Sequence, residues 1–151
     1  MSELYQEWHW EITRQCNLRC WHCLTSCGYL LNGELTTKDA SLAIEKMASI
    51  GCRRLMITGG EPLARPDIFL LLESAKRLGI STNLLTNGFA VDRDVAIRLA
   101  NLTRVVGVSL DGARAATHNQ LRGQQSFQKA CRAIELLSAS QVVAVYATIS
   151  A

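Results

Sequence analysis

The chain has 151 residues, of which 48% are hydrophobic and 19% are charged, with a formal net charge of +3. This composition fits one globular domain over residues 1–151, and the net charge is too small to indicate nucleic acid or a membrane surface as a partner, so we expect neither. There is no apolar run near the roughly 18 residues of a membrane span and no basic-then-apolar export signal, so we expect a cytoplasmic protein with reduced cysteines.

Strand and helix patterns alternate along the chain. Short apolar or alternating runs predict five strands, at residues 8–13, 54–58, 80–86, 104–110 and 142–150. Apolar residues at helical spacing predict four helices between them, at residues 37–50, 66–78, 92–102 and 127–137. Thr36 with Asp39, and Asp92, are capping residues, and Pro66 suits the first turn of its helix. This alternation predicts βαβ units and a parallel α/β sheet.

Three cysteines follow the first predicted strand in one short segment: Cys16, Cys20 and Cys23, spaced C-x3-C-x2-C. Thiolates hold iron–sulfur clusters, which usually take four of them. Three thiolates at this spacing can hold three corners of a [4Fe–4S] cube and leave one iron open. An open metal position can bind a substrate or cofactor.

The same segment is also compatible with two other kinds of metal site. Cys27 can supply a fourth thiolate, as in a ferredoxin-like electron carrier. A zinc ion can be held with His22 or Cys27 as the fourth ligand, although zinc ligands usually come as two separated pairs. We favour the three-cysteine site, because the glycine and carboxylate motifs downstream have no use in a plain electron carrier.

Those motifs each follow a predicted strand or the strand-to-helix turn after it. They are Gly59-Gly60-Glu61-Pro62, Thr86-Asn87-Gly88, Ser109-Leu110-Asp111-Gly112 and the string from His118 to Gly123. Strand ends of a parallel sheet gather at its carboxyl edge, where α/β barrels place their active sites. This clustering indicates an enzyme, while the blander alternatives are ordinary turns, a strand-end serine and a surface arginine.

The cysteine spacing and these motifs, in this order, resemble the radical S-adenosylmethionine (SAM) enzymes from about Trp8 to the last residue. The resemblance implies that Cys16, Cys20 and Cys23 bind a [4Fe–4S] cluster whose open iron chelates SAM. It also implies reductive cleavage of SAM to a 5′-deoxyadenosyl radical, with electrons from a donor such as flavodoxin or ferredoxin.

The resemblance also assigns roles to single residues. Gly59, Gly60 and Glu61 match the segment that holds the amino group of SAM. Ser109 and Arg122 match contacts to its ribose and carboxylate, where arginine's fork suits the carboxylate. His22 matches a position near the adenine, with a solvent-facing loop histidine as the alternative, and Asn87 shapes the pocket.

The motifs look most like the branch that modifies peptides, matures sulfatases or modifies tetrapyrroles. The string His118–Gly123 resembles its H-D-x-x-R-G pattern, with Asn119 in place of aspartate. We therefore expect a peptide or tetrapyrrole-like small molecule as substrate. The residues that would select the substrate are expected mostly beyond residue 151.

The implied fold is a partial (β/α) barrel of the radical SAM type, which usually has six strands. Five are predicted here, so the sixth is expected to be missing and the apolar run at residues 142–147 to form an exposed edge. The alternative function is a catalytically incomplete remnant, or a metal-binding or electron-transfer protein that does not cleave SAM. Cys52 and Cys131 are expected in the core, and Trp8, Trp10 and Ile12 are expected to pack rather than stack on a cofactor.

Overall fold

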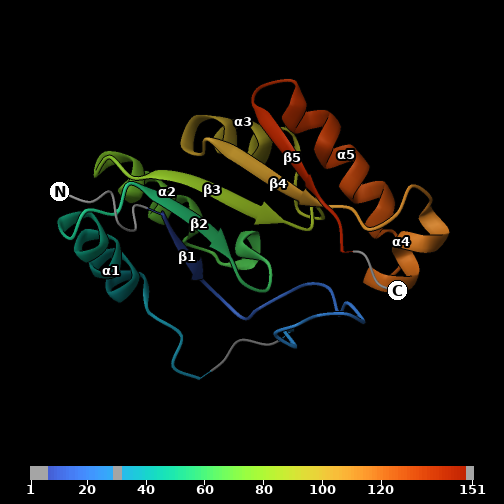
Figure 1. The fold of residues 1–151 in the computed structure, drawn as a ribbon, viewed down its shortest axis with the longest axis horizontal. Helices are drawn as coiled ribbons and strands as arrows, with labels where there is room; N and C mark the ends of the chain where they lie inside the picture. The colour runs from blue at the N-terminus through green and yellow to red at the C-terminus, as the bar shows by residue number, and fades with distance from the viewer. Residues whose placement is uncertain (1–6, 29–31, 149–151) are drawn as a thin grey trace.

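A computed structural model describes residues 7–28 and 32–148 as one parallel sheet covered by helices (Figure 1). The strands pair in sequence order, so each one lies beside the strand before it. They are β1 (Glu7–Glu11), β2 (Arg54–Thr58), β3 (Ser81–Thr86), β4 (Val105–Ser109) and β5 (Val142–Tyr146). The predicted α/β class and its five parallel strands are therefore confirmed, and β2 has the predicted bounds.

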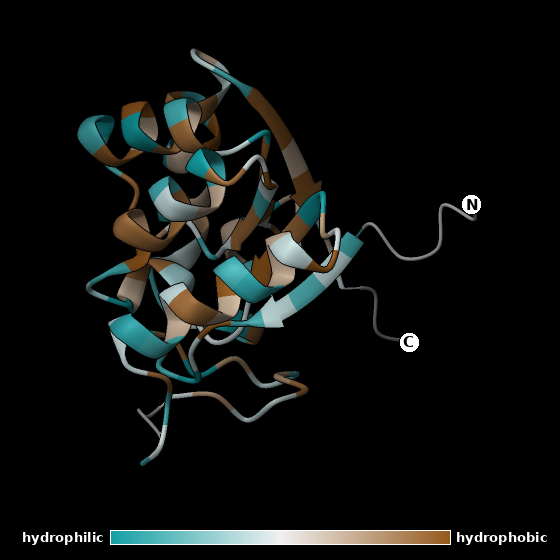
Figure 2. Cartoon of the chain, turned by 90° about the vertical axis from the view of Figure 1, so that its left-hand side faces the viewer, coloured by the Kyte–Doolittle hydropathy of each residue, from teal (hydrophilic) through white to brown (hydrophobic). Residues whose placement is uncertain are grey.

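The helices lie on one side of the sheet (Figure 2). They are α1 (Thr37–Ser49), the short 3₁₀ helix η1 (Pro62–Ala64), α2 (Ile68–Arg77), α3 (Arg93–Leu102), α4 (Ala115–Arg122) and α5 (Ser126–Ser138). Thr36 and Asp92 cap α1 and α3, as predicted. No helix in the described ranges is both long enough and apolar enough to span a bilayer.

The core lies between the sheet and this helical layer. Alternate residues of β2, Leu55 and Ile57, are fully buried, whereas Met56 and Thr58 are only partly buried. This period of two is what a sheet with one covered face requires. The helices supply the other half of the core with Ile44, Leu71, Leu72, Leu99 and Leu137.

Two local predictions were wrong, and one helix was not predicted. Helix α2 begins at Ile68 rather than at Pro66, because Pro66 and the preceding η1 form a separate turn that leads into Asp67. Helix α4 was not predicted, since its only buried residue is His118 and it has no apolar stripe. Cys131 is only partly buried, because smaller alanines on the neighbouring positions of α5 face the core.

Other core predictions are confirmed in part. Cys52 is fully buried. Ile12 is buried and Trp10 packs against the core, whereas Trp8 is 36% exposed. Residues 149 and 150 of the fifth predicted strand lie outside the described residues.

Strand β5 forms one edge of the sheet and is apolar, as expected. Its side chains Val142, Val145 and Tyr146 are 66%, 54% and 44% exposed. The ring of Tyr146 lies over Gly107 of β4, where an added Cβ would come within 2.5 Å of the ring. A side chain at position 107 would therefore displace the Tyr146 ring from its place beside β4.

Buried Arg65 holds the start of the site loop to the helical layer. Its guanidinium donates to the carbonyl oxygens of Ile12 (3.1 Å) and Leu35 (2.9 Å) and makes a two-point pair with Asp67 at 2.7 and 3.0 Å. One side chain thus joins the end of β1, the segment before α1 and the start of α2. Only an arginine fork can satisfy all three acceptors at once.

We predict that Arg65→Lys lowers the free energy of unfolding by about 2–4 kcal/mol, because the ammonium leaves buried acceptors unpaired. Urea unfolding followed by circular dichroism measures the change. Arg53→Lys, at an exposed position, is the control and should have almost no effect. Equal stability of the Arg65 and Arg53 variants would show that the fork is not needed.

Candidate functional site

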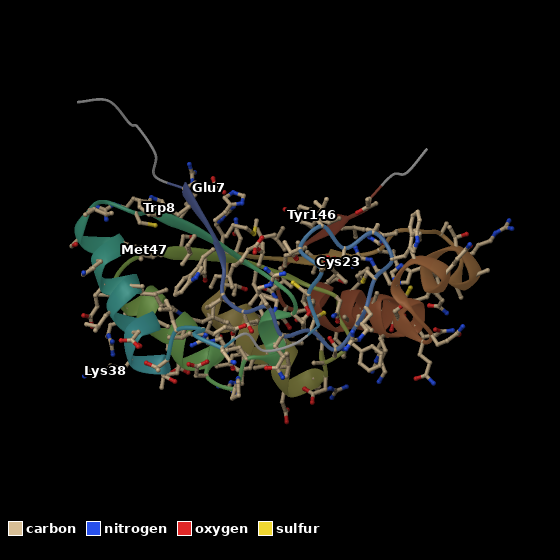
Figure 3. All side chains as sticks on the ribbon, turned by 90° about the horizontal axis from the view of Figure 1, so that it is seen from below. Glu7, Trp8, Cys23, Lys38, Met47 and Tyr146 are labelled. Carbon is tan, nitrogen blue, oxygen red and sulfur yellow. The ribbon has the colours of Figure 1, made fainter. Side chains whose placement is uncertain are left out.

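The segment from Thr13 to Gly28, here called the cysteine loop, leaves the end of β1 and crosses the carboxyl edge of the sheet. Its backbone is fixed at both sides. Gly28 N donates to Arg14 O (3.1 Å), and Trp21 N donates to Leu121 O in α4 (2.8 Å). Figure 3 shows the loop, with Cys23 labelled, running from β1 across to the helices near the C-terminus. The loop therefore bridges the first and last parts of the fold.

Gly59 and Gly60 pack directly on the backbone of this loop. Gly60 N donates to Thr13 O and Glu61 N donates to Gln15 O, each at 2.8 Å. A Cβ on Gly59 would lie 2.3 Å from Thr13 O, and one on Gly60 would lie 2.3 Å from Gln15 O. Both positions must be glycine, because any side chain would push the cysteine loop off the sheet.

A cavity of about 260 Å³ lies between this loop and the strand ends. It brings together nine of the ten residues predicted for the site, with Cys27 beside them. Its lining includes Cys16, Cys20, His22, Cys23, Gly59, Gly60, Asn87, Ser109 and Arg122. Glu61 is the tenth predicted residue, and it is buried just behind the wall.

The three predicted thiols stand around this cavity rather than at one point. No three His, Cys, Asp or Glu side chains in the described parts of the chain converge as they would around a single metal ion. Leu18 N donates to the sulfur of Cys16 at 3.4 Å, and Cys27 N donates to that of Cys23, also at 3.4 Å. Arg122 Nη1 lies 4.0 Å from the sulfur of Cys20.

The surroundings of the three thiols differ. Burial raises the pKa of Cys16 and of Cys20, and the positive charge of Arg122 offsets part of the effect at Cys20. At Cys23 the effect of burial acts in the same direction, but hydrogen bonds from Cys27, Thr25 and Ser26 outweigh it. The net result is that the pKa of the Cys23 thiol is lowered. Cys23 is the most easily ionised of the three.

Cys27 lies next to these thiols but is more enclosed. Its side chain is 8% exposed, and its sulfur is 2.8 Å from Thr25 Oγ1. The same hydroxyl is 3.8 Å from the sulfur of Cys23. Thr25 thus stands between the two thiols.

The Glu61 carboxylate is a buried link between the ends of β2 and β3. It is 1% exposed and accepts hydrogen bonds from Thr86 Oγ1 (2.7 Å), Asn87 N (2.7 Å) and Leu63 N (3.1 Å). Burial raises its pKa, and these three donors offset part of that rise. In this arrangement the Glu61 carboxylate supports the cavity wall. The expected contact between Glu61 and an amino group stays a prediction.

Asn87 continues this link into the cysteine loop. Its Nδ2 donates to Asn17 Oδ1 (2.8 Å) and lies 3.9 Å from the sulfur of Cys16, while its Oδ1 accepts from Phe89 N (2.9 Å). The amide therefore fixes the position of the loop near its first cysteine.

Asp111 is the important site residue to which sequence reasoning gave no role. Its side chain is fully buried, forms a two-point ion pair with Arg122, and has one oxygen 3.2 Å from His22 Nε2. The Arg122 hydrogen bond and charge more than offset burial and lower the pKa of Asp111. Only its place in the Ser109–Gly112 motif pointed to it.

Asn119, the departure from the expected aspartate, has a structural task in this chain. Its Oδ1 accepts from Phe127 N (2.9 Å) and from Ser126 Oγ (3.1 Å) at the start of α5. An aspartate oxygen could accept the same two bonds, so the replacement keeps the turn between α4 and α5.

A family-level comparison matches residues 10–149 to the radical SAM superfamily. The chain belongs to that superfamily. Its members use a [4Fe–4S] cluster and SAM, so the family prediction made from the cysteine spacing is confirmed.

Curated relatives match most of this chain. The mycofactocin maturase MftC of Mycobacterium ulcerans is 40% identical over 132 residues, covering 87% of this chain and 36% of the relative. The AdoMet-dependent heme synthase of Methanosarcina barkeri is also 40% identical over 132 residues, covering 85% of this chain and 38% of the relative. The chain thus spans little more than a third of the length of these relatives.

Solved radical SAM structures share the fold. The structure of native anSMEcpe with bound AdoMet, which is SAM, superposes with a TM-score of 0.79 at 24% identity, covering 93% of this chain and 43% of that one. Streptococcus suis SuiB bound to S-adenosylmethionine superposes at 0.84 with 20% identity, covering 97% of this chain and 35% of that one. At these identities the likeness establishes the partial-barrel fold.

We predict a graded loss of stability at Glu61. Glu61→Ala should lower the unfolding free energy by several kcal/mol, since each buried donor left unpaired costs roughly 1–3 kcal/mol. Glu61→Gln should cost less, because one amide oxygen can still face Thr86 and Leu63. Denaturant unfolding of cluster-free protein measures both, with exposed Glu73→Ala as the control. A Glu61→Ala protein as stable as this control would contradict the supporting role.

Proposed function

We propose that this chain binds a [4Fe–4S] cluster through Cys16, Cys20 and Cys23 and binds SAM beside it, as the core of a radical SAM enzyme. One observation carries the proposal. The three thiols share one cavity with Gly59 and Gly60 after β2, Ser109 at the end of β4 and Arg122 at the end of α4. Residues far apart in the chain thus meet at the sheet edge where such barrels do their chemistry.

The thiol arrangement accords with a cluster. A [4Fe–4S] cube takes its thiolate ligands at separate corners, and the three cysteines all line one common cavity. The sulfur of Cys27 contacts Thr25 Oγ1, so this thiol already has a polar partner within the protein. Three thiolates would leave one iron free for a cofactor.

The polar groups of the wall fit SAM. Nδ1 of His22 is buried without a hydrogen-bond partner in the described part of the chain, so a polar atom of the cavity wall awaits a ligand group. Arg122 supplies a cation suited to a carboxylate, and Ser109, 7% exposed, supplies a hydroxyl. When bound together and reduced, the cluster and SAM supply a 5′-deoxyadenosyl radical.

The substrate class is proposed from the motifs and from the relatives. Similarity to a mycofactocin maturase and to a heme synthase accords with a peptide or a tetrapyrrole-like molecule. The electron would come from a flavodoxin or ferredoxin in the cytoplasm. Neither nucleic acid nor membrane is proposed as a partner.

A second candidate function is an electron carrier or remnant that holds a fully ligated cluster, or zinc, without cleaving SAM. It is favoured by one observation, which is that Cys27 lines the same cavity as the three other thiols. In that protein Cys27 would turn from Thr25 and take the fourth corner.

We predict that anaerobic reconstitution with iron and sulfide gives a brown protein with about four irons per chain. Alanine at any of Cys16, Cys20 or Cys23 should abolish the cluster, because the cube then keeps only two of the three thiolates assigned to it. Cys131→Ala, on α5, is the matched control and should keep it. Iron and sulfide analysis measures both. A tightly bound single zinc with no uptake of iron would overturn the proposal.

We also predict that Cys27→Ala keeps the cluster and that SAM changes the electron paramagnetic resonance (EPR) spectrum of the reduced cluster in both proteins, since the fourth iron is open to SAM. The measurement is the spectrum with and without SAM. Loss of the cluster in Cys27→Ala, together with an unchanged parent spectrum, would favour the electron carrier.

A further inference from the structure

Asp111 lies just beyond β4 and joins four segments that meet at the cavity. Its oxygens face Arg122 at the end of α4 and His22 in the cysteine loop. One oxygen also accepts from Thr148 N, beyond β5, at 2.9 Å, and its own N–H donates to His118 Nδ1 at 3.1 Å. A carboxylate with no exposed side-chain surface and this many partners has one permitted orientation.

The pairing with Arg122 divides that guanidinium into two sides. Nε and Nη2 donate to the two oxygens of Asp111, whereas Nη1 lies on the side of Cys20. Arg122 lines the cavity, and its side chain is 14% exposed. The ion pair therefore occupies the Nε and Nη2 side of the guanidinium, and Nη1 remains on the side of the thiols.

An arginine held in this way needs no further ordering to bind an anion. A free arginine side chain loses rotamer freedom when it meets a ligand, which weakens binding. Here the buried aspartate has already fixed the fork. The same carboxylate faces His22, so two cavity-wall residues from different segments are oriented by one group.

We infer that Asp111 is a positioning residue, which holds Arg122 and His22 in place for binding of the carboxylate end and the neighbouring part of SAM. This inference rests on the proposed function and extends it to a residue that does not line the cavity itself. Asp111 acts through Arg122 and touches no reacting atom.

The experiment is a double-mutant cycle on reconstituted protein. SAM is titrated into the parent, Asp111→Asn, Arg122→Ala and the double variant, and the cluster's EPR change gives each dissociation constant. Asp111→Asn should raise the constant about tenfold and Arg122→Ala about ten- to a hundredfold, as lost charged hydrogen bonds do. In the double variant the constant should lie close to that of Arg122→Ala and well below the additive value, because only the positioning of His22 is left for Asp111 to provide.

Two results would overturn the inference while leaving the proposed function intact. One is Asp111→Asn binding SAM as tightly as the parent. The other is full additivity in the double variant. If the parent itself holds a cluster but gives no response to SAM, the proposed function fails and this inference fails with it.

Thr82→Val is the stability control, since it removes a buried hydrogen bond, from Thr82 Oγ1 to Leu102 O (3.0 Å), at the amino end of β3, away from the cavity. It should lower stability as Asp111→Asn does but leave the affinity for SAM unchanged. A comparable loss of affinity in this control would mean that instability alone explains the effect.

If the Asp111→Asn protein does not fold, a further variant and a measurement on cluster-free protein test the inference instead. Arg122→Lys keeps the charge but cannot face Asp111 and the cavity at once, so it should weaken SAM binding nearly as much as alanine does. Tight binding by Arg122→Lys would overturn the inference. In the cluster-free parent, the Arg122 Nε–Hε nuclear magnetic resonance signal should be resolved and slow to exchange, and a rapidly exchanging signal would contradict the ion pair.

Discussion

The contact of Gly59 and Gly60 with the backbone of Thr13 and Gln15 sets the position of everything else in the site. Two backbone hydrogen bonds of 2.8 Å fix the start of the cysteine loop on the end of β2. The contact tolerates no Cβ, because an added carbon would lie 2.3 Å from a carbonyl oxygen at either position. From that anchor the loop reaches Asn87 at the end of β3 and α4 beyond β4.

Charge at the site is arranged in two buried carboxylates with opposite behaviour. Glu61 has only neutral hydrogen-bond donors at contact distance, and burial raises its pKa. Asp111 has an arginine, and its pKa is lowered. Because its pKa is raised, Glu61 is more often neutral in the folded protein than in the unfolded chain. Because the pKa of Asp111 is lowered, its ion pair with Arg122 stabilises the fold above the ordinary aspartate pKa. This stabilisation is lost in acid, as Asp111 becomes protonated.

Sequence alone predicted the elements whose apolar residues recur with strand or helix periodicity, and the motifs whose residues have a characteristic spacing. The strand at residues 54–58 was predicted with its observed bounds because its residues are apolar and lie between turn signals. The site residues were predicted from the cysteine spacing, from the motifs that follow strands and from the resemblance of both to the radical SAM enzymes. Helix α4 could not be predicted, since burial of one histidine gives no stripe. The roles of Asp111 and Glu61 could not be predicted either, because they depend on partners far along the chain. Arg122, Thr148 and His22 lie 11, 37 and 89 residues from Asp111. Two of the donors to Glu61 lie 25 and 26 residues from it.

The strand order has a consequence for how the chain reaches its native state. Each strand pairs with the one synthesised just before it, so the sheet can grow from β1 to β5 during translation, with one helical crossover connection closed at each step. The cysteine loop is the exception, because its partners Leu121 and Arg122 lie about a hundred residues further along the chain. We expect the loop to dock last, after α4 has formed. The cavity then gains its Arg122 wall only after α4 has folded, so the site is completed late in the folding of the domain.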